Sequence, residues 1–220
     1  MKRVAVILCG SGFKDGSEIH ESVLTLLALS SRGARYHCFA LDQPQHHVVN
    51  CLSGSVIENE SRNQLVESAR IARGAVSSLK DLKVTDFDAL IFPGGFGAAK
   101  NLCNYAFAGP NARLVPEIGA VLDAFYSAKK PIGAICIAPM ILALHFKGKG
   151  LRLTLGPSDE GTFSDLRSLG QIPVEQQVEG ICVDESHRVV STPAYMHESP
   201  PLHGVATGID ALVEAVLKMI

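Results

Sequence analysis

One cysteine stands in a sequence context that can make a thiol reactive. Cys136 follows an apolar run at 131–135 and precedes Pro139, a residue suited to the first turn of a helix. A nucleophile elbow forces its central residue into a strained turn and needs small residues two positions away, which Ala134 and Ala138 supply. A thiol at the positive end of a helix is favoured as the thiolate, so the pattern predicts a lowered pKa for Cys136. The alternative interpretation is a buried cysteine that ends a strand and does no chemistry.

A glycine-rich turn at 92–97 follows another apolar run. Its sequence Phe-Pro-Gly-Gly-Phe-Gly matches neither the dinucleotide-binding fingerprint nor the phosphate-binding loop. Gly94 and Gly95 instead allow a close approach of the backbone, and the N–H of Gly95 beside that of Ile137 would form an oxyanion hole. An ordinary tight turn is the alternative.

Two acids lie at the start of a predicted helix near the N-terminus. Ser17 is a candidate cap, and Glu18 and Glu21 both suit the positive end of the helix. Helix capping alone explains either acid, but one of them could also reach the thiol. A partly buried, protonated carboxylic acid in that position would donate a hydrogen bond and transfer protons. The predicted buried stripe is marked by Ile19, Val23 and Leu26, and since neither acid lies on it, the pattern does not choose between them.

The remaining pattern alternates predicted strands with predicted helices. Strands are expected at 4–8, 35–41, 88–92, 131–135, 151–155, 180–183 and 188–191, and helices at 19–30, 63–73, 116–128 and 205–218. An irregular excursion at 42–60, with a short hairpin near Gly54, interrupts this order. Such alternation predicts right-handed βαβ units and one doubly wound α/β domain over residues 1–220, with a mostly parallel sheet. The functional crevice of such a sheet lies beyond the carboxyl ends of its strands, here at 9–17, 93–99 and 136–139.

Composition excludes several classes of protein. Hydrophobic residues make up 47% of the 220 residues and charged residues 19%, which is too apolar for a disordered chain. A net charge of −2 without a basic stripe argues against nucleic acid as a partner, and no apolar run is long enough to span a membrane. The six cysteines have neither zinc-site nor disulfide-framework spacing, so we expect a reduced, cytoplasmic protein without a metal.

These motifs together resemble the PfpI/ThiJ group of class I glutamine amidotransferase-like proteins. The resemblance runs over nearly the whole chain and is carried by D-G-S-E-I-H-E, F-P-G-G-F-G-A-A-K-N-L, C-I-A-P and T-P-A-Y-M. It is strongest to the ElbB-like branch, known for enhancing lycopene biosynthesis and for glyoxalase activity. The resemblance implies a flavodoxin-like three-layer αβα sandwich, a nucleophilic Cys136 and a partner acid on the first helix. Counting back from the Gly33 helix cap favours Glu21 as that acid, and Pro193 joins Gly94, Gly95 and Ile137 in the implied substrate-binding set.

The chain departs from this family pattern at one position. Many relatives carry a histidine about twenty residues after the nucleophile, where this sequence has Leu-Gly-Pro at 155–157. None of the candidates His20, His145 and His197 occupies that place, and each is expected at the surface or at a helix end. Peptidase or amidotransferase hydrolysis is therefore disfavoured, and Glu21 would have to move the protons.

Two functions follow from the resemblance. The first is a glyoxalase-like enzyme that needs no cofactor and converts glyoxal or similar small dicarbonyls to 2-hydroxy acids, glycolate in the case of glyoxal. The second is a non-catalytic or redox-sensing amidotransferase-like protein associated with isoprenoid biosynthesis. The expected partner is a small aldehyde substrate, and a homodimer is compatible with this fold class.

Overall fold

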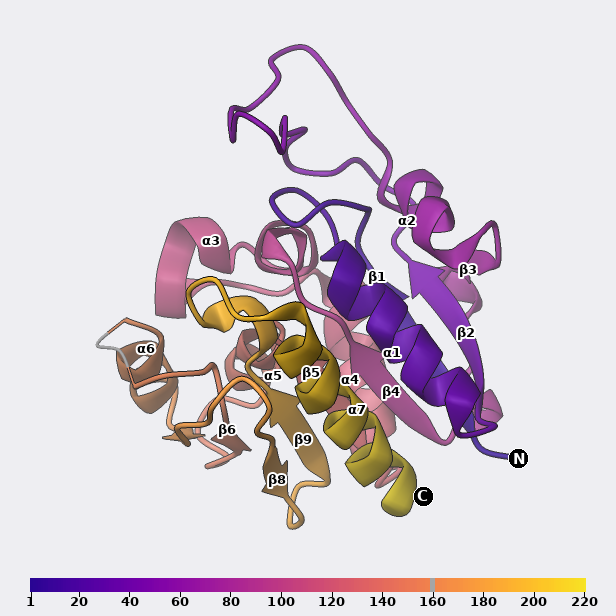
Figure 1. Ribbon diagram of the computed structural model, residues 1–220, viewed down its shortest axis with the longest axis vertical. Coiled ribbons are helices and arrows are strands. Elements are labelled where there is room, and N and C mark those ends of the chain that lie inside the picture. Colours follow the sequence, from indigo (N-terminus) through magenta and orange to yellow (C-terminus); the bar gives the residue numbers. More distant parts are fainter. Residues whose placement is uncertain (159–160) are drawn as a thin grey trace.

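A seven-stranded sheet forms the centre of the computed structural model, which describes residues 1–158 and 161–220 (Figure 1). The strand order is β3-β2-β1-β4-β5-β9-β8, and only β8 runs antiparallel to its neighbour. A separate parallel pair is formed by β6 and β7. The strands are β1 (Arg3–Leu8), β2 (Arg35–Ala40), β3 (Val76–Ser78), β4 (Ala89–Phe92), β5 (Ile132–Ile135), β6 (Arg152–Leu153), β7 (Ile172–Pro173), β8 (Cys182–Asp184) and β9 (Val189–Thr192).

The central strands are apolar along their whole length because helices cover both faces of the sheet. Every residue of β4 and β5 is buried, and β1 is buried from Val4 onward. Val6 pairs with Cys38 of β2 on one side and with Ile91 of β4 on the other, which places β1 inside the sheet. Continuous apolar runs are typical of parallel strands packed on two sides, and here they confirm the strand predictions.

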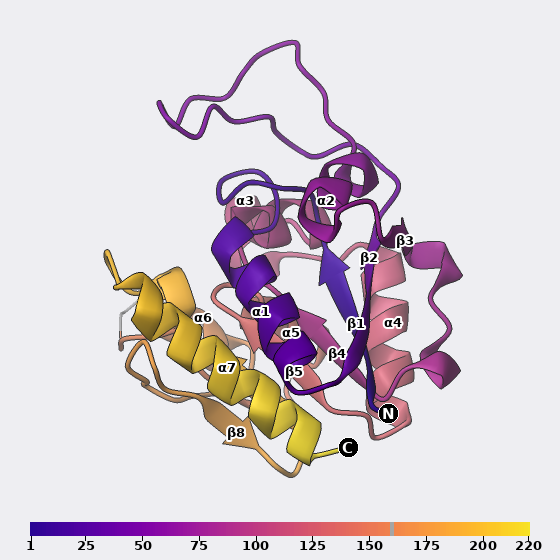
Figure 2. The same cartoon turned by 45° about the vertical axis from the view of Figure 1, so that its right-hand side comes forward.

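Helices complete the outer layers of the sandwich. In Figures 1 and 2, α1 and α7 lie side by side on one face of the sheet, and α4 lies on the other. The helices are α1 (Ile19–Ser31), α2 (Gln64–Ala72), α3 (Tyr105–Ala108), α4 (Pro116–Ser127), α5 (Pro139–His145), α6 (Thr162–Ser168) and α7 (Leu202–Lys218), with a π-helix η3 (Ala98–Leu102) and 3-10 turns η1 (Leu79–Asp81), η2 (Val84–Asp86), η4 (Gly109–Asn111) and η5 (Ala194–Met196). The architecture is the predicted flavodoxin-like α/β sandwich. Within the described ranges, no helix has the length and apolar character needed to cross a bilayer.

Two local predictions differ from the structure. The strand expected at 151–155 is reduced to β6, two residues that pair with β7 outside the main sheet. The predicted buried stripe of α1 is confirmed at Leu26 but is wrong at Ile19 and Val23, which are each 46% exposed. The buried side of α1 instead carries Glu21, Ser22 and Thr25 before it becomes apolar. The helix therefore turns a polar face inward where it starts, at the carboxyl edge of the sheet.

The excursion between β2 and α2 extends beyond that same edge (Figures 1 and 2). An isolated antiparallel bridge joins Val49 to Val56, and the N–H of Gly54 donates to the carbonyl of Asn50 at 2.7 Å. The short hairpin predicted near Gly54 is thus present.

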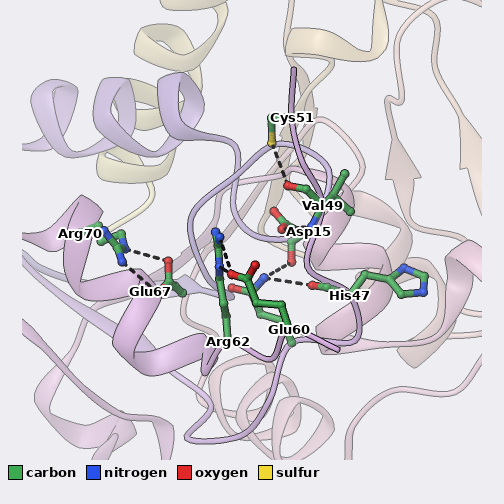
Figure 3. Close-up of polar contacts among 9 residues, drawn as sticks. Asp15, His47, Val49, Cys51, Glu60, Arg62, Glu67 and Arg70 are labelled. Carbon is green, nitrogen blue, oxygen red and sulfur yellow. Dashed lines mark hydrogen bonds and ion pairs between the residues drawn. The ribbon is translucent and has the colours of Figure 1, made fainter. Parts of the chain in front are cut away.

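Two buried side chains tie this excursion to the body of the protein. Asp15 Oδ2 accepts the N–H of Val49 at 2.7 Å, as Figure 3 shows. Asn101 accepts the N–H of His46 through Oδ1 at 2.9 Å, and its Nδ2 donates to the carbonyls of Cys9 and Asp15 at 3.0 and 2.8 Å. The loop after β1, the excursion and η3 therefore share one hydrogen-bond network.

Candidate active site

Cys136 occupies a strained turn directly after β5. Its φ of 60° lies in the left-handed region, which is uncommon for a residue with a side chain. The N–H of Cys136 donates to the carbonyl of Thr192, and the N–H of Ala138 closes the turn onto Ile135, both at 2.9 Å. Ala134 and Ala138 are fully buried, so larger side chains would have no room on either side. This is the geometry that the A-x-C-x-A spacing predicted.

Glu21 lies against the thiol from the first turn of α1. Its side chain is completely buried, Oε2 accepts the N–H of Gly94 at 2.9 Å, and the carboxyl lies close enough to the thiol of Cys136 for each group to shift the pKa of the other. Glu18 has a different place, because its carboxylate caps α1 by accepting the N–H of Glu21 at 2.7 Å. Ser17, a predicted cap, instead accepts the N–H of Cys9. The structure thus separates the two acids that the sequence pattern left equivalent.

The buried carboxyl of Glu21 holds its proton unusually tightly. Burial raises its pKa from the usual 4.5 to about 8, and the neighbouring Glu18 adds to the rise. Hydrogen bonds with Cys136 and with the N–H groups of Gly94 and Tyr195 oppose it. A carboxyl with a pKa near neutrality can both accept and donate a proton at physiological pH.

The thiol of Cys136 is not acidified as the sequence predicted. Burial raises its pKa well above the usual value, and the charge of Glu21 raises it further, while the N–H groups of Gly95 and Ile137 lower it. The helix that was expected to stabilise the thiolate, α5, has seven residues and begins only at Pro139. The positive end of α5 stabilises the thiolate by at most about 2 kcal/mol. Burial destabilises the thiolate by more than that. Deprotonation of Cys136 therefore calls for a base in contact, and Glu21 has that position.

The glycine turn packs closely against Cys136 and Glu21. A Cβ on Gly94 would lie 2.5 Å from Cβ of Cys136 and 2.7 Å from Oε2 of Glu21. Gly95 has a φ of 97°, and a Cβ there would collide with the backbone N of Glu18. Close approach therefore requires glycine at both positions, and the left-handed backbone conformation requires it at Gly95 as well.

The predicted oxyanion set is only partly assembled. The N–H groups of Gly95 and Ile137 both point to the sulfur, and both residues line the adjoining cavity. The N–H of Gly94 is used by Glu21, so Gly94 positions the acid and is not free to hold an oxyanion. Pro193 is buried where it precedes η5 and does not line the cavity, which corrects its predicted place in the substrate wall.

A cavity of about 600 Å³ opens above the sulfur. Cys136, which is 7% exposed, contributes to its floor. The wall includes aromatic, apolar and polar residues, namely Phe13, Glu18, His20, Gly95, Phe96, Tyr105, Ile137, Thr162, Tyr195, Met196, His197, Ser199 and Pro200. Within residues 1–158 and 161–220, no group of three or more His, Cys, Asp and Glu is arranged to hold a metal ion.

His20, exposed in the first turn of α1, and His197, which ends η5, occupy helix ends as expected, and both also line this cavity. His20 Nδ1 and the hydroxyl of Tyr195 are 2.7 Å apart, and His197 Nε2 lies 3.0 Å from the carbonyl of Gln176. His145, the last residue of α5, does not line the cavity. Its Nε2 lies 2.8 Å from Oδ1 of Asp123 in α4. Sequence reasoning missed His20 and Tyr195 as a pair. The available signal was the position of His20 beside Glu21, at the sheet edge that carries the thiol.

Comparisons with known proteins identify the family and the fold. The model of the DJ-1/PfpI family matches residues 2–196. The ES1 protein homolog, mitochondrial, of Rattus norvegicus is 44% identical over 99% of this chain and 84% of its own length. The glutamine amidotransferase-like class 1 domain-containing protein 3, mitochondrial, of Homo sapiens is 43% identical over 99% of this chain and 83% of its own. These names contradict the prediction of a cytoplasmic protein, which rested only on cysteine spacing.

A solved structure extends the similarity to three dimensions. An isoprenoid biosynthesis protein with an amidotransferase-like domain from Ehrlichia chaffeensis is 36% identical, with a TM-score of 0.90 over 99% of this chain and 100% of that one.

Proposed function

This chain belongs to the DJ-1/PfpI family, and we propose that it is a cofactor-independent, glyoxalase-like enzyme. Its reaction would convert glyoxal or a similar small dicarbonyl to the 2-hydroxy acid, with Cys136 as the nucleophile. The observation that carries the proposal is the contact between a thiol on a strained turn and a buried carboxyl whose pKa is close to neutrality.

The proposed reaction begins with a proton transfer inside this pair. Glu21, as the carboxylate, accepts the thiol proton while the sulfur of Cys136 adds to the aldehyde carbon. A carbon–sulfur bond forms, the carbonyl π bond breaks, and the proton reaches the new oxyanion to give a hemithioacetal. The N–H groups of Gly95 and Ile137, which face the sulfur, would stabilise the oxyanion.

The second stage moves hydrogen between the two carbons of the substrate. Glu21 removes the proton from the carbon that carries sulfur and delivers it to the neighbouring carbonyl carbon, while the hydroxyl proton of the hemithioacetal passes to the other oxygen, which leaves a thioester of the 2-hydroxy acid. Water then hydrolyses the thioester and restores the thiol. The sum is one dicarbonyl plus one water to one 2-hydroxy acid, an internal redox reaction that consumes no external oxidant or reductant.

The direct test is glyoxal turnover measured as glycolate formation. Wild type should produce glycolate, Cys136→Ser should produce none above background, and Glu21→Gln should lose about 10²-fold or more in kcat/KM. Glu18→Gln is the matched control, because Glu18 caps the same helix without touching the thiol. Equal losses in the two glutamine variants would mean that the acids only support α1, and the proposed proton transfer would be wrong.

A second function is favoured by one feature of the relatives. The similar solved structure is named for isoprenoid biosynthesis, and a buried thiol with a raised pKa is compatible with a protein that binds or senses without turnover. This alternative predicts that wild type forms no glycolate from glyoxal. Glycolate formation that depends on Cys136 would reject it.

A further inference from the structure

The cavity above Cys136 is much larger than glyoxal. Its volume is about 600 Å³, whereas a water molecule occupies ~30 Å³ in the liquid and glyoxal, with four heavy atoms, about twice that. Cavities of several hundred cubic ångströms are typical of sites for larger organic ligands. Glyoxal alone would leave most of the space above the sulfur filled with water.

The wall of the cavity is suited to an apolar substituent. Phe13 and Phe96 are 46% and 54% exposed, and the N–H of Phe96 donates to the carbonyl of Phe13 at 2.8 Å, which holds the two segments together. Ile137 and Met196 add aliphatic surface to the same wall. Half-exposed aromatic rings that line a concave site are typical of ligand recognition.

The charges around the cavity disfavour an anionic ligand. Glu18 lines the wall, whereas no lysine or arginine lines the cavity among the residues that the structure describes. Lys14 and Lys100 rest near the rings of Phe13 and Phe96 and are not part of the wall. A carboxylate or phosphate on the substrate would therefore face negative charge without a cationic partner.

The polar groups that remain suit a second carbonyl oxygen. His20 and Tyr195 are joined at 2.7 Å and both line the cavity, so either can donate to a ketone oxygen. We propose that the site takes neutral carbonyl compounds with a bulky, aromatic or similarly apolar substituent, in preference to glyoxal and to anionic compounds. The aldehyde carbon would meet the sulfur, and the substituent would pack on Phe13 and Phe96. The inference rests on the proposed function for the chemistry, but the ligand class rests on the cavity alone.

Turnover provides the first test. We expect kcat/KM for phenylglyoxal, measured as mandelate formed, to exceed that for glyoxal by about 10- to 100-fold. Phe96→Ala should lower the phenylglyoxal value about 10-fold and the glyoxal value by a clearly smaller factor. Phe107→Ala is the matched control, because Phe107 is 51% exposed but packs on His46 outside the cavity. A higher kcat/KM for glyoxal, or equal losses for both substrates in Phe96→Ala, would overturn the inference.

Binding without chemistry separates this inference from the proposed function. In Cys136→Ser, calorimetry should detect 2-hydroxyacetophenone, a neutral aromatic ketone, and Phe96→Ala in the same background should weaken it about 10-fold. Mandelate, its anionic counterpart, should bind more weakly by a similar factor. Binding of the ketone without turnover of either aldehyde by wild type would support the ligand class and reject the glyoxalase proposal. Glyoxal turnover by wild type without ketone binding would support the glyoxalase proposal and reject the ligand class.

Discussion

Cys136 and Cys9 are two buried cysteines in equivalent places, each directly after a buried parallel strand at the carboxyl edge of the sheet. After β1, the strain of the turn falls on Gly10, whose φ is 109°, whereas after β5 the cysteine itself takes the left-handed conformation. Cys9 Sγ lies 3.4 Å from the hydroxyl of Ser17, and burial raises its pKa to about 12. Cys136 contacts a carboxyl and a cavity instead. Position at a strand end is therefore insufficient for reactivity, and a neighbouring base and an access route make the difference.

The largest expected effect comes from removing each thiol in turn. Cys136→Ala should lower glyoxal turnover by about 10⁴-fold or more, because Cys136 is the only cysteine among the described residues that line the cavity. Cys9→Ala should keep turnover within about 3-fold and cost only about 1 kcal/mol in the free energy of unfolding. Initial rates and denaturant titrations on both variants measure this contrast. A comparable loss of activity in Cys9→Ala would show that the two turns act as one unit.

The next effect is a pH dependence of the free energy of unfolding that arises from the Glu21 carboxyl beside Cys136. Between pH 4.5 and about 8 the Glu21 carboxyl ionises in the unfolded chain but stays protonated in the folded one, so its contribution to stability falls as pH rises. At about 1.4 kcal/mol for each pKa unit, the upper bound of this loss is about 5 kcal/mol. Glu21→Gln should abolish the dependence, and its free energy of unfolding should therefore exceed that of wild type most at pH 8. A constant difference between the two proteins from pH 5 to pH 8 would contradict the raised pKa.

A smaller effect tests the close approach at the glycine turn. Gly94→Ala should push Cβ into Cys136 and Glu21, lowering the free energy of unfolding by roughly 2 kcal/mol and reducing turnover as well. Gly119→Ala is the control, because its Cβ would meet only the ring of His145, at 3.2 Å, and it lies within α4. Thermal unfolding and initial rates should separate the two variants, and equal behaviour would mean that the turn at Gly94 can relax.

The smallest effect concerns the hydroxyl in the cavity wall. Tyr195→Phe removes the partner of His20 and should lower kcat/KM about 3- to 10-fold without changing stability. Tyr36→Phe provides a matched control on an exposed tyrosine of β2. If Tyr195→Phe retains full activity, the cavity wall acts by shape alone.

The sheet and the thiol turn were predictable because both depend on local sequence. Continuous apolar runs identified the central strands, and small residues around Cys136 indicated its strained turn. The acid was harder to predict, since Ile19 and Val23 suggested an inward stripe that the structure places outward. A helix whose first turn buries a carboxyl breaks the usual apolar pattern at the position that matters for chemistry.

Other features of the site depend on tertiary structure and left little trace in the sequence. The pairing of His20 with Tyr195 joins residues 175 positions apart, and no local spacing encodes it. The direction of the Cys136 pKa shift was also mispredicted, because a helix end can be recognised in a sequence but the depth of burial cannot. Burial decided both the protonation of Glu21 and that of the thiol.

The Asn101 amide has a consequence for how the protein opens. Its three hydrogen bonds join the excursion at His46, the strand end at Cys9 and the turn at Asp15 to one side chain, so a displacement of Asn101 breaks the contacts of all three segments. The backbone amides of His46 and Val49 should therefore exchange their hydrogens with solvent in one cooperative event. The backbone amides of the turn after β1, at residues 9–17, should exchange in the same event. The long excursion between β2 and α2 thus belongs, in its unfolding behaviour, to the same cooperative unit as the central strand β1.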